Sequence, residues 1–227
     1  MKEFIVNLIK LVLSVIVVLF IEEYFFKVMS LVGLHLTETP LVRLIIYILE
    51  FIIIYIIYGR EISAAFSKYQ NKLGSNFLYT VISYIVVFIA MMITNYLVRL
   101  IATNLNIRYS GLNYINIFNK TFNFDLIVLF ITTMIIIPFV KVSIFVLGIN
   151  NLFKGKIGIF FSGLLYALYE GFLIGGNFGH VFIDVIDEFV LFVLLSYIYR
   201  KNSNIAFSIV TFILYELFSA LLITKIV

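Results

Sequence analysis

Long apolar segments separated by short polar stretches are the feature that most constrains this chain. Most of these segments are long enough to cross the roughly 30 Å hydrocarbon core of a bilayer as helices. They do not alternate apolar and polar residues with period two, as the strands of an outer-membrane barrel do. Hydrophobic residues make up 63% of the chain, charged residues only 12%, and the mean hydropathy is +1.16. Because a soluble domain is about half apolar and a quarter charged, we predict an all-α, polytopic transmembrane helical bundle.

We expect about seven spans in a single integral membrane domain that covers residues 1–227. The spans are expected within residues 1–27, 41–58, 77–102, 124–147, 157–173, 181–199 and 205–223. The first is interpreted as a retained span because no small-residue cleavage pattern follows its apolar run. Thr39-Pro40 is expected to begin the second helix. Residues 59–76 are expected to form a polar loop that lies partly as an interfacial helix, because apolar residues recur in it at helical spacing.

The basic residues favour a cytoplasmic N-terminus. With seven spans, nine basic residues fall on the N-terminal side, six fall on the other side, and Lys141 falls within the membrane. Cytoplasmic loops carry the excess of Lys and Arg, so we expect an N-in, C-out protein. Abundant Ile, Phe, Tyr, Asn and Lys suggest an AT-rich bacterial genome, and hence the inner (cytoplasmic) membrane. The bases are scattered over loops, so the lipid bilayer is the expected partner and no nucleic acid is expected.

Three motifs follow one another in the C-terminal half of the chain. Ile137-Pro138-Phe139 comes first, and Leu165-Tyr166-Ala167-Leu168-Tyr169-Glu170 places an acid four residues after an aromatic residue. Ser203-Asn204-Ile205-Ala206-Phe207 then opens the last helix, which contains Glu216. This layout resembles that of the CAAX-protease and bacteriocin-processing (CPBP, or Abi) family of intramembrane proteins. The resemblance implies that residues 1–123 hold N-terminal spans and residues 124–227 form a CPBP-like core.

The catalytic motifs of that family are degenerate in this chain. Lys141-Val142 stands in place of the glutamate pair, Val146 in place of an arginine, and Glu170 and Phe212 in place of the two histidines. In family members believed to be proteolytic, the glutamates and histidines activate water. The resemblance therefore implies a pseudoprotease, with the family's fold and without its usual machinery. Family members of that kind act as immunity or partner-binding proteins.

Two glutamates at bilayer depth are the main candidate site residues. Glu170 follows a long apolar run, and Glu216 lies near the middle of the last span. A carboxylate at that depth faces protein or water rather than lipid, and burial favours its neutral form unless a cation or donors stabilise the anion. Lys141 is the only basic residue equally deep, so we predict a Lys141–Glu170 pair across neighbouring helices.

We also predict that Glu170 and Glu216 face one shared cavity, and Glu50 in the second span is a candidate for the same polar interior. Two carboxylates that lie close together cannot both be ionised without a large cost. Such a cluster could fix the register of the helices, or it could bind a ligand or protons. Both roles are open at this point.

A second group of candidates lies at the start of the sixth span. His180 and Asp184 share one helix face, and Asp187 and Glu188 follow within a turn. Because imidazole and carboxylate groups together can bind a divalent ion, His180, Asp184 and Glu170 form an alternative metal site. The simpler interpretation is that the acids occupy the positive end of the helix dipole at the water interface. On that interpretation no metal or other cofactor is expected.

We therefore expect a non-proteolytic protein that acts as an immunity, scaffold or regulatory partner of another integral membrane protein. One alternative is a divergent intramembrane endopeptidase that uses Glu170 and Glu216. Another is a small transporter or substrate-binding subunit whose buried carboxylates carry protons or bind a cation. The chain has no cysteine and no Walker, His-Glu-x-x-His or Gly-x-Ser-x-Gly motif, so a thiol enzyme, an ATPase, a zincin and a serine hydrolase are not expected.

Overall fold

Every regular element in the described part of the chain is helical. The computed structural model describes residues 2–21, 25, 31, 39–107, 124–174 and 178–226. Over these residues the elements are α1 (Lys2–Leu19), α3 (Pro40–Gln70), α4 (Leu73–Asn104), α6 (Phe124–Ile131), the π-helical turn η2 (Thr132–Ile136), α7 (Ile137–Val142), the π-helical turn η3 (Ser143–Gly148), α8 (Ile149–Leu152), α9 (Gly155–Ile174), α10 (Phe178–Asn202) and α11 (Ile205–Ile226). The predicted all-α class is confirmed for these residues.

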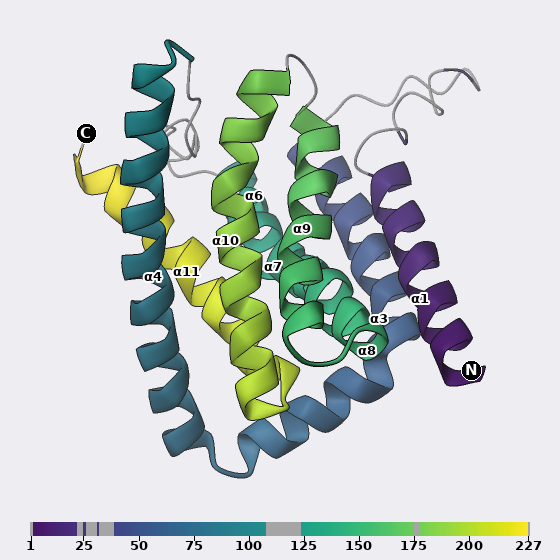
Figure 1. The fold of residues 1–227 in the computed structure, drawn as a ribbon. Coiled ribbons are helices and arrows are strands. Elements are labelled where there is room, and N and C mark those ends of the chain that lie inside the picture. The colour runs from purple at the N-terminus through teal and green to yellow at the C-terminus, as the bar shows by residue number, and fades with distance from the viewer. Residues whose placement is uncertain are drawn as a thin grey trace.

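The long helices alternate in direction, so their connections gather at two ends of one bundle (Figure 1). The N-terminus, the α3–α4 connection, the turn after α8 and the α10–α11 connection lie at the lower end in this view. α10 lies in the middle and packs against α9, α4 and α11. The lower end therefore carries the segments that contain the nine basic residues assigned to the N-terminal side: Lys2, Lys10, Arg60, Lys68, Lys72, Lys154, Lys156, Arg200 and Lys201.

α3 is longer than the sequence predicts. It continues through Gly59 to Gln70, so the expected loop at residues 59–76 is wrong, whereas the helix expected within that stretch is confirmed. Ile62, Ala65 and Tyr69 are buried at helical spacing along this part. In Figure 1 the second half of α3 turns away from the direction of the first half and runs along the lower end of the bundle to α4. Burial of this apolar stripe outweighs the roughly 1 kcal/mol that a glycine costs inside a helix.

The two prolines occupy different kinds of position. Pro40 is the first residue of α3, where a missing N–H costs nothing, and Thr39 Oγ1 accepts a hydrogen bond from the Val42 amide at 3.3 Å. This predicted helix start is confirmed. Pro138 lies inside the continuous helical stretch 124–152, directly after η2. A π-helical turn changes the hydrogen-bond register, which helps a helix to contain a residue that cannot donate.

The stretch from Thr132 to Leu152 is the centre of the bundle, and we call it the core helix. Most of its residues are buried, including all six from Ser143 to Gly148. Burial around the whole circumference requires neighbours on every side, and α1, α3, α9, α10 and α11 all contact it. A charged side chain on this helix therefore has little access to lipid or water.

Four described helices are long and apolar enough to cross a bilayer: Leu41–Gln70, Leu73–Asn104, Thr132–Leu152 and Gly155–Leu173. Large apolar side chains also cover the outside of the bundle. Ile56 of α3, Ile9 of α1 and Leu168 of α9 are 77%, 60% and 60% exposed. A soluble monomer does not leave so many apolar side chains in water. The chain is therefore a membrane protein.

Candidate functional site

The predicted contact between Lys141 and Glu170 is confirmed. Lys141 lies on α7 in the core helix, and its Nζ is 2.5 Å from Glu170 Oε1 on α9. The two side chains are only 12% and 17% exposed. At this depth the ammonium and the carboxylate stabilise each other, because each would otherwise be a charge removed from water without a counter-ion.

Aromatic rings from α9 enclose the ion pair. Lys141 Nζ lies 5.5 Å from the ring centroid of Tyr166 and 5.7 Å from that of Tyr169. Tyr166 is also a side-chain hydrogen-bond partner of Glu170. Its ring stacks on Phe192 of α10 and meets Phe145 of the core helix edge to face. The ammonium is therefore held by a carboxylate and by two π-faces, and close packing fixes one of those rings.

Further carboxylates converge on the same region from α10 and α11. Glu188 lies close enough to interact electrostatically with Glu170, Lys141, Glu216 and Asp187. Asp187 is 3% exposed and Glu216 is 9% exposed. Glu170 and Glu216 thus both act electrostatically on Glu188, and the cavity that they are predicted to share stays a prediction. The charges of three other carboxylates and of the Lys141 ammonium therefore act on Glu188. We call these five residues the carboxylate cluster.

Two members of the cluster correct the sequence interpretation. Their position in the first turns of a helix predicts that Asp187 and Glu188 lie at the water interface. Instead, Asp187 is buried and Glu188 is half-buried. The reason is tertiary, because α10 lies in the middle of the bundle and this turn faces α9 and α11. Asp184, one turn earlier, is also half-buried. The sequence signal was the presence of three acids in one apolar helix, which favours an inward face.

The remaining candidates are Glu50, on α3, and the alternative metal site. Glu50 is buried on α3, and its predicted place in the same polar interior stays a prediction. The described residues contain no group of three or more His, Cys, Asp or Glu side chains placed to hold a metal ion. The structure does not describe the side chain of His180. The alternative metal site of His180, Asp184 and Glu170 therefore stays a prediction.

A second buried polar network, which sequence reasoning missed, joins the lower ends of the core helix, α9 and α10. Asn150 Nδ2 donates to Ser162 Oγ at 3.0 Å and to Ser196 Oγ at 2.7 Å. Arg200 Nε donates to Asn150 Oδ1 at 2.6 Å, and its Nη2 donates to the carbonyl oxygens of Asn150 and Phe153. The guanidinium thus satisfies carbonyl groups that the end of α8 leaves without intrahelical partners.

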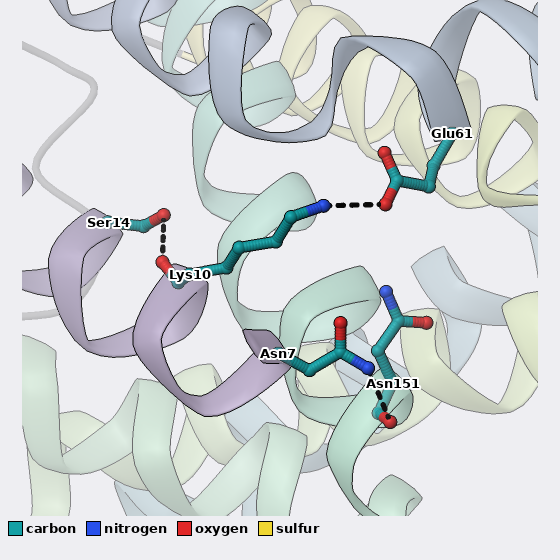
Figure 2. A network of polar contacts seen from close by, with 5 residues as sticks. All are labelled: Asn7, Lys10, Ser14, Glu61 and Asn151. Atoms are coloured by element: carbon teal, nitrogen blue, oxygen red, sulfur yellow. Dashed lines mark hydrogen bonds and ion pairs between the residues drawn. The ribbon is translucent and has the colours of Figure 1, made fainter. Parts of the chain in front are cut away.

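A third network ties α1 to the bundle at the same end (Figure 2). Lys10 Nζ is 2.9 Å from Glu61 Oε1 on α3, and Asn7 Nδ2 donates to the Asn151 carbonyl oxygen at 3.4 Å. The Lys10 and Glu61 side chains are 29% and 36% exposed. A pair this open to solvent contributes about 0–1 kcal/mol, so it is a peripheral contact and differs in kind from the Lys141–Glu170 pair.

Comparisons of the chain with protein-family models, with curated proteins and with solved structures find no match.

Proposed function

We propose that this chain is a non-hydrolytic, multipass protein of the inner (cytoplasmic) membrane that acts as an immunity, scaffold or regulatory partner of another integral membrane protein. The observation that carries the proposal is the Lys141–Glu170 ion pair. On the proposed CPBP-like arrangement of residues 124–227, Glu170 occupies the position of a catalytic histidine. A general base has to be free to take up a proton from water. This carboxylate is instead neutralised by an ammonium and hydrogen-bonded to Tyr166, so its role is to hold the core helix to α9.

The proposed membrane placement has seven spans with the N-terminus in the cytoplasm. Beyond the four helices named above, α1 has apolar, exposed side chains along its outer face. α10 carries acids, but Asp187 and Glu188 turn towards the carboxylate cluster rather than outward. α11 buries Glu216 in the same way. Inward-facing acids are compatible with a transmembrane helix, and the basic lower end then faces the cytoplasm.

An apolar groove on the outside of α9 and α10 is the proposed docking face for a transmembrane helix of the partner. Its volume is about 460 Å³, and every residue that lines it is apolar. Ala167 and Gly171 are among the lining residues. Gly171 lies against Val181 and Val185 of α10, so the small residues form the floor of the groove. The large apolar side chains of Leu168, Phe172 and Phe182 are exposed for packing against a third helix.

Site-specific photo-crosslinking in membranes of the native host tests this docking face. A crosslinker replaces Leu168, which lines the groove and is 60% exposed, or Tyr96 on α4, which is 64% exposed and lies outside the groove. We expect one discrete adduct from position 168 and none from position 96. A Leu164→Trp change fills the groove and should abolish the adduct. Equal adducts at both positions, or an adduct that survives Leu164→Trp, would contradict the proposal.

The endopeptidase alternative makes the opposite prediction about the carboxylates. If Glu170 and Glu216 activated water, Glu170→Gln and Glu216→Gln would each abolish peptide-bond cleavage without lowering the amount of folded protein. On our proposal, Glu170→Gln lowers stability and neither change removes an activity. Cleavage of membrane-embedded peptide substrates by the purified protein distinguishes the endopeptidase alternative from our proposal.

A second candidate function, the binding of protons or a cation, is favoured by the several acidic side chains that act on Glu188. The charges acting on Glu188 are those of three other carboxylates and one ammonium. Carboxylates that interact with one another in a buried site favour the uptake of a proton or of a cation. Liposomes that contain the protein and an internal pH dye test this role. Proton uptake that Glu216→Gln abolishes would support it, and identical traces for the wild type and the variant would exclude it.

A further inference from the structure

A second groove, between α4 and α10, differs from the α9–α10 groove in having a charged end. It has a volume of about 140 Å³ and is lined by Tyr79, Ile82, Ser83, Val86, Val87, Leu194, Tyr197, Ile198 and Lys201. We call it the α4–α10 groove. α4 begins and α10 ends at the lower end of the bundle (Figure 1), so Tyr79 and Lys201 lie near that end. Val86, Val87 and Leu194 lie deeper in the membrane.

We propose that the α4–α10 groove binds one anionic phospholipid of the leaflet on the N-terminal side of the membrane. The proposal assumes the membrane placement given above and adds a ligand to it. The first support for it is the arrangement of polar and apolar side chains along the groove. The deep part is formed by apolar side chains, whereas the interfacial end has an ammonium and the hydroxyl groups of Tyr79 and Tyr197. This order matches a phospholipid, whose anionic phosphate lies at the interface and whose acyl chain lies below it.

The position of Lys201 is the second support. Its Nζ lies 5.7 Å from the ring centroid of Tyr79 across the groove, and the residue is exposed. The aromatic ring therefore holds the ammonium at the mouth of the groove. None of the nine lining residues is acidic, so the groove itself supplies no competing carboxylate for this cation.

The length of the groove also fits one leaflet. From Tyr79 to Val87, α4 rises by about 12 Å at 1.5 Å per residue. Half of the hydrocarbon core measures about 15 Å. An acyl chain whose headgroup contacts Lys201 would therefore lie in the groove over most of its leaflet.

The surrounding charge selects an anionic headgroup. Lys201 belongs to a set of seven exposed bases at the lower end of the bundle, the others being Lys2, Arg60, Lys68, Lys72, Lys154 and Lys156. Of the two acids at this end, Glu61 is paired with Lys10 and Glu3 remains. Bases near the surface attract anionic lipids, and a base close to the headgroup contributes an approximately fivefold preference that falls off within a Debye length.

Native mass spectrometry of the purified protein, equilibrated with equal amounts of phosphatidylglycerol and phosphatidylcholine, tests the proposal. We expect the wild type to retain one phosphatidylglycerol in preference to phosphatidylcholine. Lys201→Gln should reduce this preference about fivefold. Lys156→Gln removes the same charge from the same end but outside the groove, and should leave the retained lipid nearly unchanged. Thermal unfolding of each variant verifies that it is folded.

A second variant tests the apolar part of the groove without altering charge. Val86 is 56% exposed, so Val86→Trp fills the groove with little effect on the core. We expect it to reduce retention of the lipid. Equal effects of Lys201→Gln and Lys156→Gln would show a general charge effect and overturn the site. Unchanged phosphatidylglycerol retention in both Lys201→Gln and Val86→Trp would also overturn it, because the retained lipid would then bind elsewhere on the protein.

Discussion

Replacing Lys141 with methionine gives the sharpest test of how the bundle interior is held together. Methionine preserves most of the volume of the lysine stem but removes the ammonium. Glu170 then keeps Tyr166 as a partner but loses its counter-ion at 2.5 Å. Breaking a buried ion pair from one side costs about 3–5 kcal/mol, because the remaining charge stays buried and uncompensated. Lys141→Met should therefore lower the free energy of unfolding by about that amount.

Removing Lys141 and removing Glu170 should not lower the free energy of unfolding by the same amount. The Lys141 ammonium acts on Glu188 as well as on Glu170, and its loss removes an attractive charge from a region that also contains Asp187 and Glu216. Glu170→Gln removes one of those acids and leaves Lys141 facing the others, so we expect a smaller loss of about 1–2 kcal/mol. The double variant should lose less stability than the sum of the losses in the two single variants, with a coupling energy of about 1–3 kcal/mol.

The pH dependence follows from the same charges. In Lys141→Met the penalty comes from ionised carboxylates, Glu170 first among them, that have lost the Lys141 ammonium. Lowering the pH protonates them, so the difference in stability from the wild type should shrink as the pH falls and grow as it rises. A difference that grows on acidification would show that the cluster is not the source of the penalty.

Unfolding in dodecyl maltoside by titration with sodium dodecyl sulfate, followed by tyrosine fluorescence and circular dichroism, gives the free energies of unfolding. Lys10→Met is the matched control, because its pair with Glu61 has the same chemistry at 29% and 36% exposure. It should cost no more than about 1 kcal/mol. If Lys141→Met costs no more than Lys10→Met, or if Glu170→Gln costs more than Lys141→Met, the reasoning is refuted.

Other predictions concern the lower end of the bundle. Gly158→Ala should destabilise the protein by several kcal/mol, about the cost of other strong core perturbations, because its Cβ would collide with the Phe153 carbonyl oxygen. Gly74→Ala, whose Cβ would meet nothing within 4 Å, should be neutral or stabilise α4 by up to about 1 kcal/mol. Arg200→Lys should cost about 2–4 kcal/mol, because an ammonium cannot reproduce the guanidinium fork that bonds Asn150. Thermal denaturation in detergent measures all three, and a stable Gly158→Ala or Arg200→Lys variant would contradict the packing described here.

The sequence alone determined the class of the protein and much of its helical segmentation. Hydropathy identified the apolar helices, and the Thr39-Pro40 step identified the start of α3. The sequence also predicted the Lys141–Glu170 contact, because only one basic residue lay as deep in the membrane as Glu170 and could neutralise it. This inference needed no knowledge of packing, since a buried charge in a membrane restricts the choice of partner so strongly.

Tertiary structure alone decided which way the polar residues of each helix face. Asp187 and Glu188 occur where helix-dipole reasoning predicts solvated acids, but the central position of α10 turns them towards the carboxylate cluster. The continuation of α3 past Gly59 and the bonds from Arg200 to Asn150 likewise depend on neighbours from distant parts of the chain. The physical reason lies in the solvent. Acyl chains and a protein core are equally apolar, so hydropathy shows that a helix crosses the membrane but not which face packs against protein, and only the assembled bundle makes that choice.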